Sequence, residues 1–588
     1  MSVATTSANP APTPTPTPTR AEVEPRPSWK RWLPTPKILI LGVVAAIVAY
    51  LAIIPLWFLI QGTFFDSTTN LFTLDGFKRA YTDAQSLEMM GNSIWFASGS
   101  AMLSLCVGTA LAFLNVRTDV PFKGLFFAAS IIPLVIPGIL YTVSWIFLAS
   151  PDIGLVNFAL EPVFGPGTVN IYSVWGMIWV EGLHLSPITF LFMVAAFRAQ
   201  DPSLEESALM SGASRLTVLR KITVPLLRPA IAASVLIMTV RALESFEVPA
   251  LLGLQEGIYV FTSKIYFMLR TYPQDLNGAG ALALGLLSIA AMGMVLEHLL
   301  SRGAKAYQTV TGKGFRPRPI ELGSWRPVAG VVIIGYFFLT VVLPMLMLLY
   351  TSLLPYYQKP SGEAFRSMTF GNYRALLDMS TATTALKNSL FLGATSATMV
   401  MIFMAIAAWI VVRSNIPGRK LLDLLSFAPL VIPGLVLGLS LQFVYLRSPI
   451  PIYGTIWILL IAYCTRYMPY GMRYAVTSMQ QISSELEESA SVSGATWWQV
   501  FRRVLLPLLM PGLLAGWIYI FVVSFRELSS SILLYSSGNE ILSILIWEQF
   551  ENGKFTILAA LGVVMVAVLM VLVSIAYKLG AKVGLQQD

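Results

Sequence analysis

The chain has 588 residues, of which 56% are hydrophobic and 12% are charged, and its formal net charge is +9. Average proteins carry about 25% charged residues, so this chain has too little charge to cover the surface of a soluble protein of its length. The composition therefore excludes a soluble globular protein and favours a membrane protein.

The chain begins with a Pro- and Thr-rich tail, residues 1–37, which we expect to be disordered and cytoplasmic, because alternating Pro and Thr favour an extended, unpacked chain. A first membrane span is predicted directly after it. Residues 38–60 contain no charged residue, and a helix of this length crosses a hydrocarbon core of about 30 Å. The apolar region of a secretory signal is shorter, about 7–15 residues, so we expect this run to be retained as a span.

Apolar windows along the rest of the chain predict twelve spans in two sets of six. The first set is 38–60, 92–115, 125–149, 171–196, 226–247 and 279–300, and the second is 327–352, 388–412, 421–446, 453–478, 508–534 and 556–578. The predicted fold class is therefore an all-α polytopic membrane protein with about 12 transmembrane helices. Its parts are a first half at 38–300, a basic linker at 301–326 and a second half at 327–588.

Basic residues are concentrated in the tail, in the loop after the second span and in the linker. The linker has six Lys or Arg residues against a single acid, Glu321, whereas the loop at 150–170 has two acids and no base. Cytoplasmic loops carry the excess of positive charge, so both termini and the linker are predicted to be cytoplasmic. This bias accounts for the net charge, and no nucleic-acid partner is expected.

Several segments recur along the chain. The segment at 205–229 returns at 487–511, and the hexapeptide PLVIPG at 133–138 returns letter for letter at 429–434. Arg117 recurs as Arg413, at the end of the second span of each half. Because each half has an even number of spans, both halves face the same way and should be related by an axis along the membrane normal. The sequence thus predicts an internal duplication into two parallel six-helix repeats.

The recurring segment at 205–229 is polar and interrupts the membrane spans. Ser203 and Ser484 are predicted to cap a short helix in each copy, and Gly212 and Gly494 to end it in a left-handed turn. A second helix, at 214–223 in the first copy, should lead to Pro225 or Pro507 at the start of the next span. We call each such unit a coupling handle: residues 203–223 form the first and residues 484–505 the second.

The spacing E-x-A-x3-G, followed by a proline thirteen residues after the glycine, resembles the EAA loop of ABC-importer permeases. Serine replaces the first alanine of that motif in both copies (Ser207 and Ser489). The resemblance implies that the handles dock on a cytoplasmic ATPase. The implied ATPase-coupling residues are Glu205, Glu206, Ala208, Gly212, Pro225, Glu487, Glu488, Ala490, Gly494 and Pro507.

Further implications follow from this resemblance, which covers nearly the whole chain after residue 37. Two copies of an ABC ATPase and a periplasmic substrate-binding protein are the implied partners, and the bacterial inner membrane is the implied location. A fused double permease is most similar to the ferric-iron import type, while related groups carry thiamine, 2-aminoethylphosphonate or polyamines. The implied mechanism is ATP-driven alternating access.

No nucleotide-binding loop is found in the sequence. Gly312-Lys313 lacks the earlier Gly and the following Ser or Thr that G-x-x-x-x-G-K-[ST] requires. We therefore expect ATP and Mg to be bound by the partner ATPase, and this chain to be a pore subunit without a cofactor, a metal site or enzymatic activity. The two histidines, His184 and His298, suggest no catalytic cluster.

Polar residues within predicted spans are candidates for the translocation path, because they are costly in a membrane and face a cavity or one another. The candidates are Glu181, His184, Arg241, Glu244, Glu247, Arg466, Arg526 and Glu527. An equally supported reading makes Glu181–His184 and Arg526–Glu527 structural pairs between packed helices. The predicted helix interruptions, which expose backbone groups that need partners, are Pro133, Pro137, Gly138, Pro429, Pro433 and Gly434.

The main alternative function is a proton-coupled secondary transporter, which can also have twelve spans in two parallel halves. Such a carrier does not need matched cytoplasmic handles. One of the major facilitator kind would also have a Gly- and Arg-rich loop after its second span, where this chain has NVRTDVPFKG at 115–124. The sequence therefore favours the importer.

Overall fold

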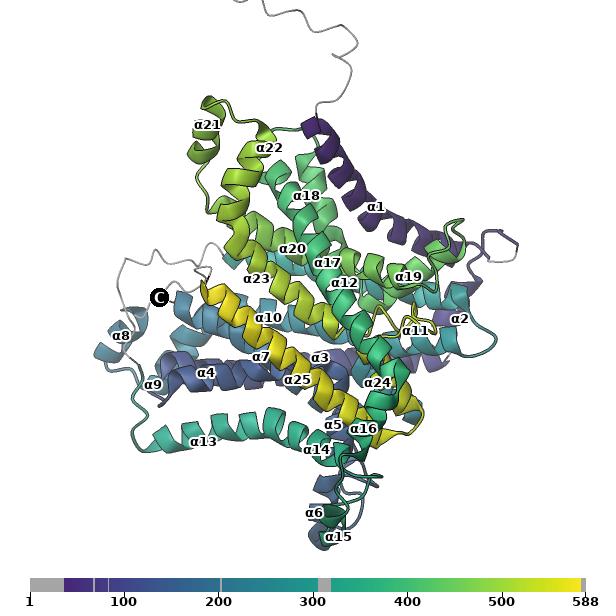
Figure 1. The fold of residues 1–588 in the computed structure, drawn as a ribbon. Coiled ribbons are helices and arrows are strands. Elements are labelled where there is room, and N and C mark those ends of the chain that lie inside the picture. Colours follow the sequence, from purple (N-terminus) through teal and green to yellow (C-terminus); the bar gives the residue numbers. More distant parts are fainter. Residues whose placement is uncertain (1–35, 67–68, 83, 201–202, 305–318, 583–588) are drawn as a thin grey trace, which may run out of the picture.

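The computed structural model of the protein describes residues 36–66, 69–82, 84–200, 203–304 and 319–582. Nearly all of the predicted tail 1–37 and the middle of the predicted linker 301–326 lie outside these ranges. Within them the chain is built from helices and connecting loops (Figure 1), and its paired extended residues amount to two isolated bridges. The predicted all-α class is confirmed.

Nine helices in the described ranges are long and apolar enough to cross a membrane. They are α1 (Pro36–Phe64), α3 (Ala84–Arg117), α7 (Val174–Ala199), α10 (Val224–Glu244), α12 (Leu276–Ala304), α13–η8–α14 (Arg326–Phe337, Phe338–Val342, Leu343–Ser352), α17 (Ser380–Arg413), α23 (Leu506–Phe525) and α25 (Phe555–Lys582). Two bent helix pairs raise the number of candidate spans to as many as eleven. The predicted span at 508–534 ends earlier, with α23 at Phe525, because an irregular segment follows.

The remaining predicted span, 453–478, corresponds to α20 (Ile456–Gln480), a helix of 25 residues. Its length suffices to cross a bilayer at 1.5 Å per residue, but it is not among the helices that are apolar enough. Arg466, Arg473 and several tyrosines lower its hydropathy. The helix packs between α17 and α23, where Arg466 is paired with Glu527, whereas Arg473 is exposed.

The two PLVIPG segments break the third span of each half. In the first half α4 (Lys123–Ile131) and η2 (Ile132–Val135) meet α5 (Gly138–Ala149) at 97°. In the second half α18 (Arg419–Phe427) and η9 (Ala428–Val431) meet α19 (Gly434–Leu446) at 108°. The residue before each second proline is extended, as proline requires of its predecessor. The helix breaks therefore lie at the predicted Pro–Gly interruptions, and the predicted spans at 125–149 and 421–446 are bent at these breaks.

The first helix of each half packs on the opposite half. α1 lies along α18 and α19, and α13–α14 packs on α4 and α5. The hydroxyls of Tyr50 on α1 and Tyr445 on α19 are 2.8 Å apart. The last helix of each half, α12 or α25, packs on that half's own first helix. The two halves are thus interlocked by an exchange of their first helices.

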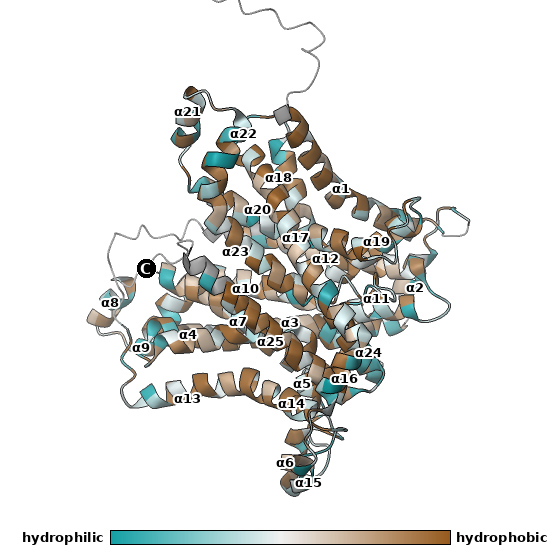
Figure 2. Ribbon diagram, viewed as in Figure 1, coloured by the Kyte–Doolittle hydropathy of each residue, from teal (hydrophilic) through white to brown (hydrophobic). Residues whose placement is uncertain are grey.

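Short helices lie at both ends of the bundle. Figure 1 places α8 (Ser203–Met210) and α21 (Glu485–Val492) at the end where α1 begins and α25 ends. The opposite end carries α2 (Asp75–Tyr81), α11 (Phe261–Arg270), α16 (Gly371–Asp378) and α24 (Leu542–Glu551). Figure 2 colours the outward helices α1, α13 and α25 mainly as hydrophobic, and their exposed side chains include Trp57 and Val331, as expected of helices that face lipid.

Some elements have no counterpart in the other half. α6 (Leu155–Phe164) lies between α5 and α7, where the second half has only a short loop, and α15 (Gly362–Arg366) precedes α16 in the second half. The turns η4 (Pro249–Gly253), η5 (Leu254–Glu256) and η7 (Gly323–Trp325) complete the described elements outside the handles. These additions leave the handles and the spans that carry them alike in the two halves.

Candidate functional site

Both coupling handles have the same course. Each begins with α8 or α21 and continues after a glycine turn into α9 (Arg215–Val218) or α22 (Trp497–Val500). Gly212 has φ +87° and Gly494 has φ +85°, the left-handed region that favours glycine. The predicted turn is therefore confirmed in both copies.

The turn closes the handle helix through the backbone of the motif residues. The amide of Ala213 donates to the carbonyl of Ala208 at 3.0 Å, and the amide of Ala495 donates to the carbonyl of Ala490 at 3.1 Å. These bonds satisfy carbonyls that a helix end leaves unpaired. The alanine and glycine positions of the motif thus have a structural role that is the same in both halves.

The predicted cap by Ser484 is not found, because Ser484 has helical backbone angles (φ −64°, ψ −25°) and no side-chain cap bond. The cap by Ser203 borders residues outside the described ranges and stays a prediction. Side-chain caps are found on the second helix of each handle. Ser214 caps α9, and Thr496 with Gln499 forms a reciprocal capping box at α22. The glycine turn leaves these residues in the extended conformation that a cap needs.

The predicted second helix at 214–223 is α-helical over four residues and then widens into one turn of π-helix, η3 (Leu219–Thr223). The second copy does the same at η10 (Phe501–Leu505). Pro225 or Pro507 follows as the second residue of the next span. A proline has no N–H to donate to the preceding turn, and a wider turn at this place is a common adjustment within helices at functional sites.

An ion pair joins each handle to the end of the second span. Arg117, the last residue of α3, lies 3.4 Å from Glu205, and Arg413, the last residue of α17, lies 3.0 Å from Glu487. The first glutamate of each motif therefore points back to the bundle. Glu206 is half-buried and Glu488 is exposed.

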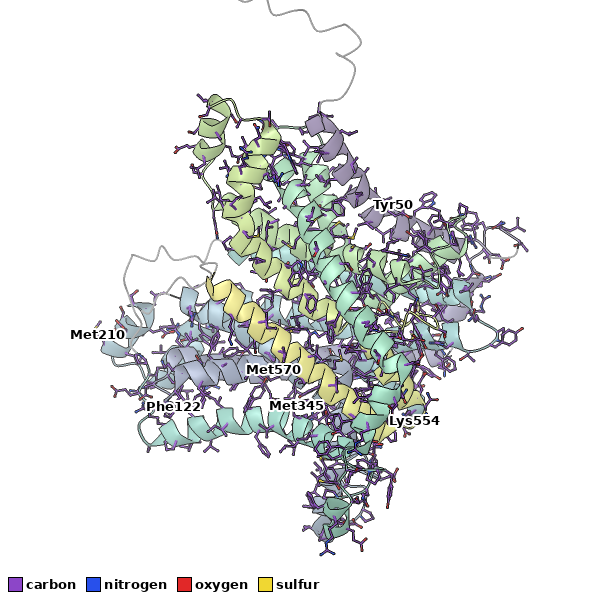
Figure 3. The ribbon with its side chains drawn as sticks, viewed as in Figure 1. Tyr50, Phe122, Met210, Met345, Lys554 and Met570 are labelled. Carbon is purple, nitrogen blue, oxygen red and sulfur yellow. The ribbon has the colours of Figure 1, made fainter. Side chains whose placement is uncertain are left out.

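The outer surface of the handles is apolar at equivalent positions. No residue of α8 or α21 is buried. Met210 and Val492, two residues before each turn glycine, are 83% and 89% exposed. Leu204 and Leu486 are also exposed. Figure 3 labels Met210 at the tip of α8, at the far end from the bundle.

The candidate path residues gather near the ends of α10 and α23. In the first half, the hydroxyl of Ser245 donates to the carboxylate of Glu181 at 3.0 Å. The ring of His184 packs on that of Tyr141 with centroids 5.2 Å apart, and its Nδ1 has no hydrogen-bond partner among the described residues. Glu181 and His184 do not form a pair with each other.

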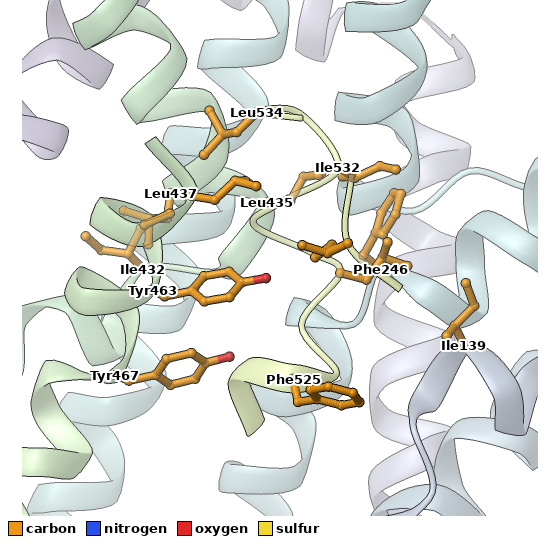
Figure 4. Close-up of a cluster of buried hydrophobic side chains, with 14 of the residues drawn as sticks. Ile139, Phe246, Ile432, Leu435, Leu437, Tyr463, Tyr467, Phe525, Ile532 and Leu534 are labelled. Carbon is orange, nitrogen blue, oxygen red and sulfur yellow. The ribbon is translucent and has the colours of Figure 1, made fainter. Parts of the chain in front are cut away.

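In the second half, Glu527 is the centre of a denser network. Its carboxylate accepts from the hydroxyl of Tyr467 at 2.6 Å and from the backbone amide and hydroxyl of Ser530, each at 2.9 Å. Arg466 lies 3.7 Å away. Figure 4 shows the hydroxyls of Tyr463 and Tyr467 pointing toward the irregular segment that follows α23. Glu527 therefore pairs with α20 and not with its neighbour Arg526.

Two hydrogen bonds join the halves at this level. Arg526 donates to the carbonyl of Leu134, in the first-half break, at 2.7 Å. Arg241 of the first half donates to the hydroxyl of Tyr470 at 2.8 Å. The break of the second half has a donor from its own half, because Arg466 donates to the carbonyl of Ile432 at 3.2 Å. Backbone groups freed at the interruptions thus find arginine partners.

The remaining acids face the same arginines. Glu244 lies near the charges of Arg241 and Arg466, and Glu247 lies near those of Glu527, Arg526 and Arg466. Glu247 lies directly over Gly138: a side chain added there would meet its carboxylate at 1.9 Å. The interruption glycine of the first half is therefore needed for close approach. We call the eight candidate path residues the central polar cluster: Glu181, His184, Arg241, Glu244, Glu247, Arg466, Arg526 and Glu527.

The sequence did not identify several partners. No sequence motif marks the partners of the cluster, which are Ser245, Tyr467 and Tyr470. The same holds for the partners at the handles, which are Gln200, Thr223 and Trp409. The recurrence of Arg117 as Arg413 was the available signal for the handle ion pairs. Within the described ranges, no group of three or more His, Cys, Asp or Glu side chains is placed to hold a metal ion.

Comparison with known proteins gives a consistent family. The sequence profile described as "Binding-protein-dependent transport system inner membrane component" matches residues 104–305 and again 397–582. The ferric transport system permease protein FbpB of Actinobacillus pleuropneumoniae is 27% identical over 498 residues, covering 83% of this chain and 70% of that protein. A putative ferric transport system permease protein FbpB of Haemophilus influenzae is 27% identical over 508 residues, covering 85% and 78%.

Other similar proteins match one half. A putative 2-aminoethylphosphonate transport system permease protein, PhnV of Salmonella typhimurium, is 28% identical over 263 residues, covering 44% of this chain and 97% of that protein. Among solved structures, a chain of a bacterial ABC transporter involved in the import of alginate has a TM-score of 0.38 and 20% identity, covering 46% of this chain and 96% of that one.

Proposed function

The chain belongs to the inner-membrane components of binding-protein-dependent transport systems, and on that premise we propose that it forms the complete pore of an ATP-driven importer of ferric iron. Two separate ATPase subunits drive it, one on each coupling handle. A binding protein delivers the cargo to the opposite end of the bundle. The chain itself performs no reaction.

The observation that carries this proposal is the geometry of the two handles. They lie at one end of the bundle, turn at glycines with nearly equal φ angles, and expose an apolar side chain at the same position before each turn. An exposed apolar side chain on a rigid, unburied helix suits the groove of a partner. Two matching surfaces on one chain suit two copies of the same partner.

The orientation of the chain follows from the same end of the bundle. We place the handles in the cytoplasm, where ATP is available, and therefore also the start of α1 and the end of α25, which lie at that end. The basic linker and the charge bias of the loops support this orientation. The membrane is then the bacterial inner membrane.

The translocation path runs between the halves, through the central polar cluster. Rocking of one half against the other must break the bonds that join them, from Arg526 to the carbonyl of Leu134 and from Arg241 to Tyr470. Both lie next to the glycine-containing breaks or the ends of the fifth spans. In alternating access, ATP-driven closure of the handles exchanges these bonds for contacts that open the other side.

Ferric iron as the cargo rests on the relatives that cover both halves, whose printed names are ferric permeases. Carboxylate and phenol oxygens, the hard ligands that suit a small, highly charged cation, are present in and next to the cluster. Several of them are bonded to serines or arginines, so they offer passing contacts rather than a tight site; these are the oxygens of Glu181, Glu527, Tyr463 and Tyr470. Thiamine, 2-aminoethylphosphonate and polyamines are the competing cargoes.

The test is to purify the tagged chain from its native membrane in mild detergent and identify the proteins that accompany it. The recovered complex is then placed in liposomes with its binding protein and with ferric iron or each competing cargo. We expect ATP-dependent uptake of ferric iron alone. Uptake driven by a proton gradient without ATP would instead establish the secondary transporter, and ATP-dependent uptake of another cargo would correct the substrate.

A further inference from the structure

We propose that Arg117 and Arg413 are positioning residues that hold the coupling handles at a fixed angle to the bundle, so that force from the ATPase moves the spans. This inference rests on the proposed function. The proposal is about the contacts that hold a handle to its own chain, whereas the family motif is about docking of the handle on the ATPase.

The first helix of each handle needs such an anchor, whereas the second part of the handle is packed through buried residues such as Val218 and Phe501. No residue of α8 or α21 is buried, so apolar packing does not set the angle of either helix. The chain connects each handle to the fourth span on one side and to the fifth span on the other. A helix held by two backbone connections can swivel about them, and a glycine turn adds freedom.

In the first half, four elements meet around Arg117. Its guanidinium donates to the side-chain oxygen of Gln200, just after α7, at 2.5 Å, and pairs with Glu205 on α8 at 3.4 Å. The hydroxyl of Thr223 in η3 donates to the same Glu205 oxygen at 2.7 Å. The Gln200 side-chain amide closes the ring by donating to the carbonyl of Thr223 at 3.2 Å. The helix α8 is thereby tied to the end of the second span, to the residue that follows the fourth span, and to η3, which leads into the fifth span.

The second half makes the same tie with different neighbours. Arg413 pairs with Glu487 at 3.0 Å and donates to the carbonyls of Met479, in the last turn of α20, and of Ile482, just after that helix. The indole N–H of Trp409, on α17, donates to the other oxygen of Glu487 at 3.1 Å. The Trp409 ring in turn packs on Trp497 of α22, with centroids 5.2 Å apart.

The bonds around Arg117 and those around Arg413 can be compared to find what the two anchors share. Gln200 is replaced by a backbone carbonyl, and the Thr223 hydroxyl by an indole N–H from another element. The guanidinium and the carboxylate are present in both. Each pair also joins the C-terminus of a span to the first turn of a handle helix, where both charges are favoured by the helix dipoles. The ion pair is therefore the shared element of the anchor.

The arginine and the glutamate of the ion pair can be exchanged in the first half, but not in the second. Around Arg117 and Glu205, the Gln200 amide can turn over and the Thr223 hydroxyl can donate or accept. Around Arg413, two backbone carbonyls can only accept, so a carboxylate placed there would meet two acceptors. Arg117→Glu with Glu205→Arg should restore the anchor, while Arg413→Glu with Glu487→Arg should not.

The experiment uses the whole transporter, with its ATPase and binding protein, in liposomes, and measures cargo transported per ATP hydrolysed in complexes that have retained ATPase. Arg117→Glu and Glu205→Arg should each lower this ratio about tenfold, the scale of a coupling free energy between two sites. The double exchange should recover most of it. Glu205→Gln, which keeps the side chain's size, provides a milder variant should the reversals fail to fold.

The matched control is Lys123→Glu, an equal charge reversal on an exposed side chain close to Arg117 in sequence, which should leave the ratio unchanged. A purely structural role would lower the yield of the complex without changing the ratio, and so would contradict the proposal. A normal ratio in Glu205→Gln and Glu205→Arg, or equal recovery by the exchange in both halves, would also overturn it. If the unaltered chain binds no ATPase, the proposed function itself fails.

Discussion

The coupling handles and the central polar cluster stem from the same internal duplication, yet the two regions compare very differently between the halves. The two handles have nearly the same glycine φ angles, the same helix-closing bonds and a turn of π-helix at the same place. In the cluster, equivalent positions have exchanged their chemistry. His184 corresponds to Arg466, and Glu244 to Arg526.

This difference fits what each region must contact. Under the proposed function each handle binds one copy of the same subunit, so both handles have to keep the shape that fits that subunit. A path on the axis between the halves serves one cargo at a time, so its two sides need only be complementary to each other. Arg526 and Arg241, which bond across the interface, have no arginine at the equivalent position of the other half.

The largest effect should come from charging the tips of the handles. Met210→Glu or Val492→Glu should weaken ATPase binding about a hundredfold or more, because about 1.5–3 kcal/mol of apolar burial is lost and an unpaired charge enters an interface. The two variants should be equally harmful, as measured by retention of ATPase on the purified chain. Unequal losses would break the equivalence of the handles. Ile416→Glu, at an exposed site in the loop between α17 and α18, serves as the control.

A smaller and unequal effect is expected at Glu244 and Arg526, which occupy equivalent positions. Arg526→Ala removes the donor to the Leu134 carbonyl and should slow uptake about tenfold, since an unpaired buried acceptor costs about 1–3 kcal/mol. Glu244→Ala should slow it less, because the described residues offer Glu244 no hydrogen bond to lose. Uptake per bound ATPase measures both. Loss of ATPase binding in either variant would contradict a path role.

Tyr470→Phe should have a milder effect than either. It removes the hydroxyl that accepts from Arg241 and keeps the ring that packs on Tyr519, 5.3 Å away. We expect a change of about 1 kcal/mol in the balance between the two conformations of the pore, seen as a shift in the basal ATPase rate. Tyr474→Phe, which keeps its ring contact with Tyr519 and makes no bond across the halves, should cause no shift.

The smallest effect is expected at the outer end of the bundle, where Arg79 on α2 pairs with Asp275 at 2.8 Å. Burial opposes ionisation of Asp275, but the hydrogen bonds from Arg79 and from the amide of Gly278 outweigh it and lower its pKa. A depressed pKa gives stability above the ordinary aspartate value of about 3.9, lost as the pH falls through the folded value. Asp275→Asn should therefore destabilise the protein at pH 7.

The loss should be about 1 kcal/mol or less, because Arg79 is half exposed and solvent screens such pairs. Thermal unfolding in detergent measures it. The difference between the variant and the unaltered chain should shrink as the solution is acidified below about pH 4. A difference that is independent of pH would show that the pair contributes packing and not charge.

The sequence was sufficient for the features that depend on near neighbours. The handle turns at Gly212 and Gly494 and the breaks at PLVIPG follow from local backbone rules, and the spans follow from apolar runs. The capping by Ser484 was predicted wrongly because the actual start of the helix puts that residue within the helical conformation. The span at 453–478 was predicted from an apolar window, but α20 is less apolar than the other spans, and it packs between α17 and α23.

The features that depend on tertiary packing were beyond the sequence. Nothing local indicates that α1 packs on α19 or that Arg117 meets Glu205 far along the chain. The pairing within the cluster also depends on tertiary packing. Glu527 contacts Tyr467 and Arg466 on α20, and Arg526 donates to a carbonyl of the other half. Spacing alone suggested neighbouring residues as partners, and the fold separates them.

The most direct test of the account is the number of ATPase subunits carried by one chain, measured by native mass spectrometry of the complex purified from its own membrane. Two matching handles predict two copies, reduced to one by Met210→Glu or by Val492→Glu and to none by both changes together. A chain that carries no ATPase after mild cross-linking, or that keeps both copies when both handles are altered, would contradict it.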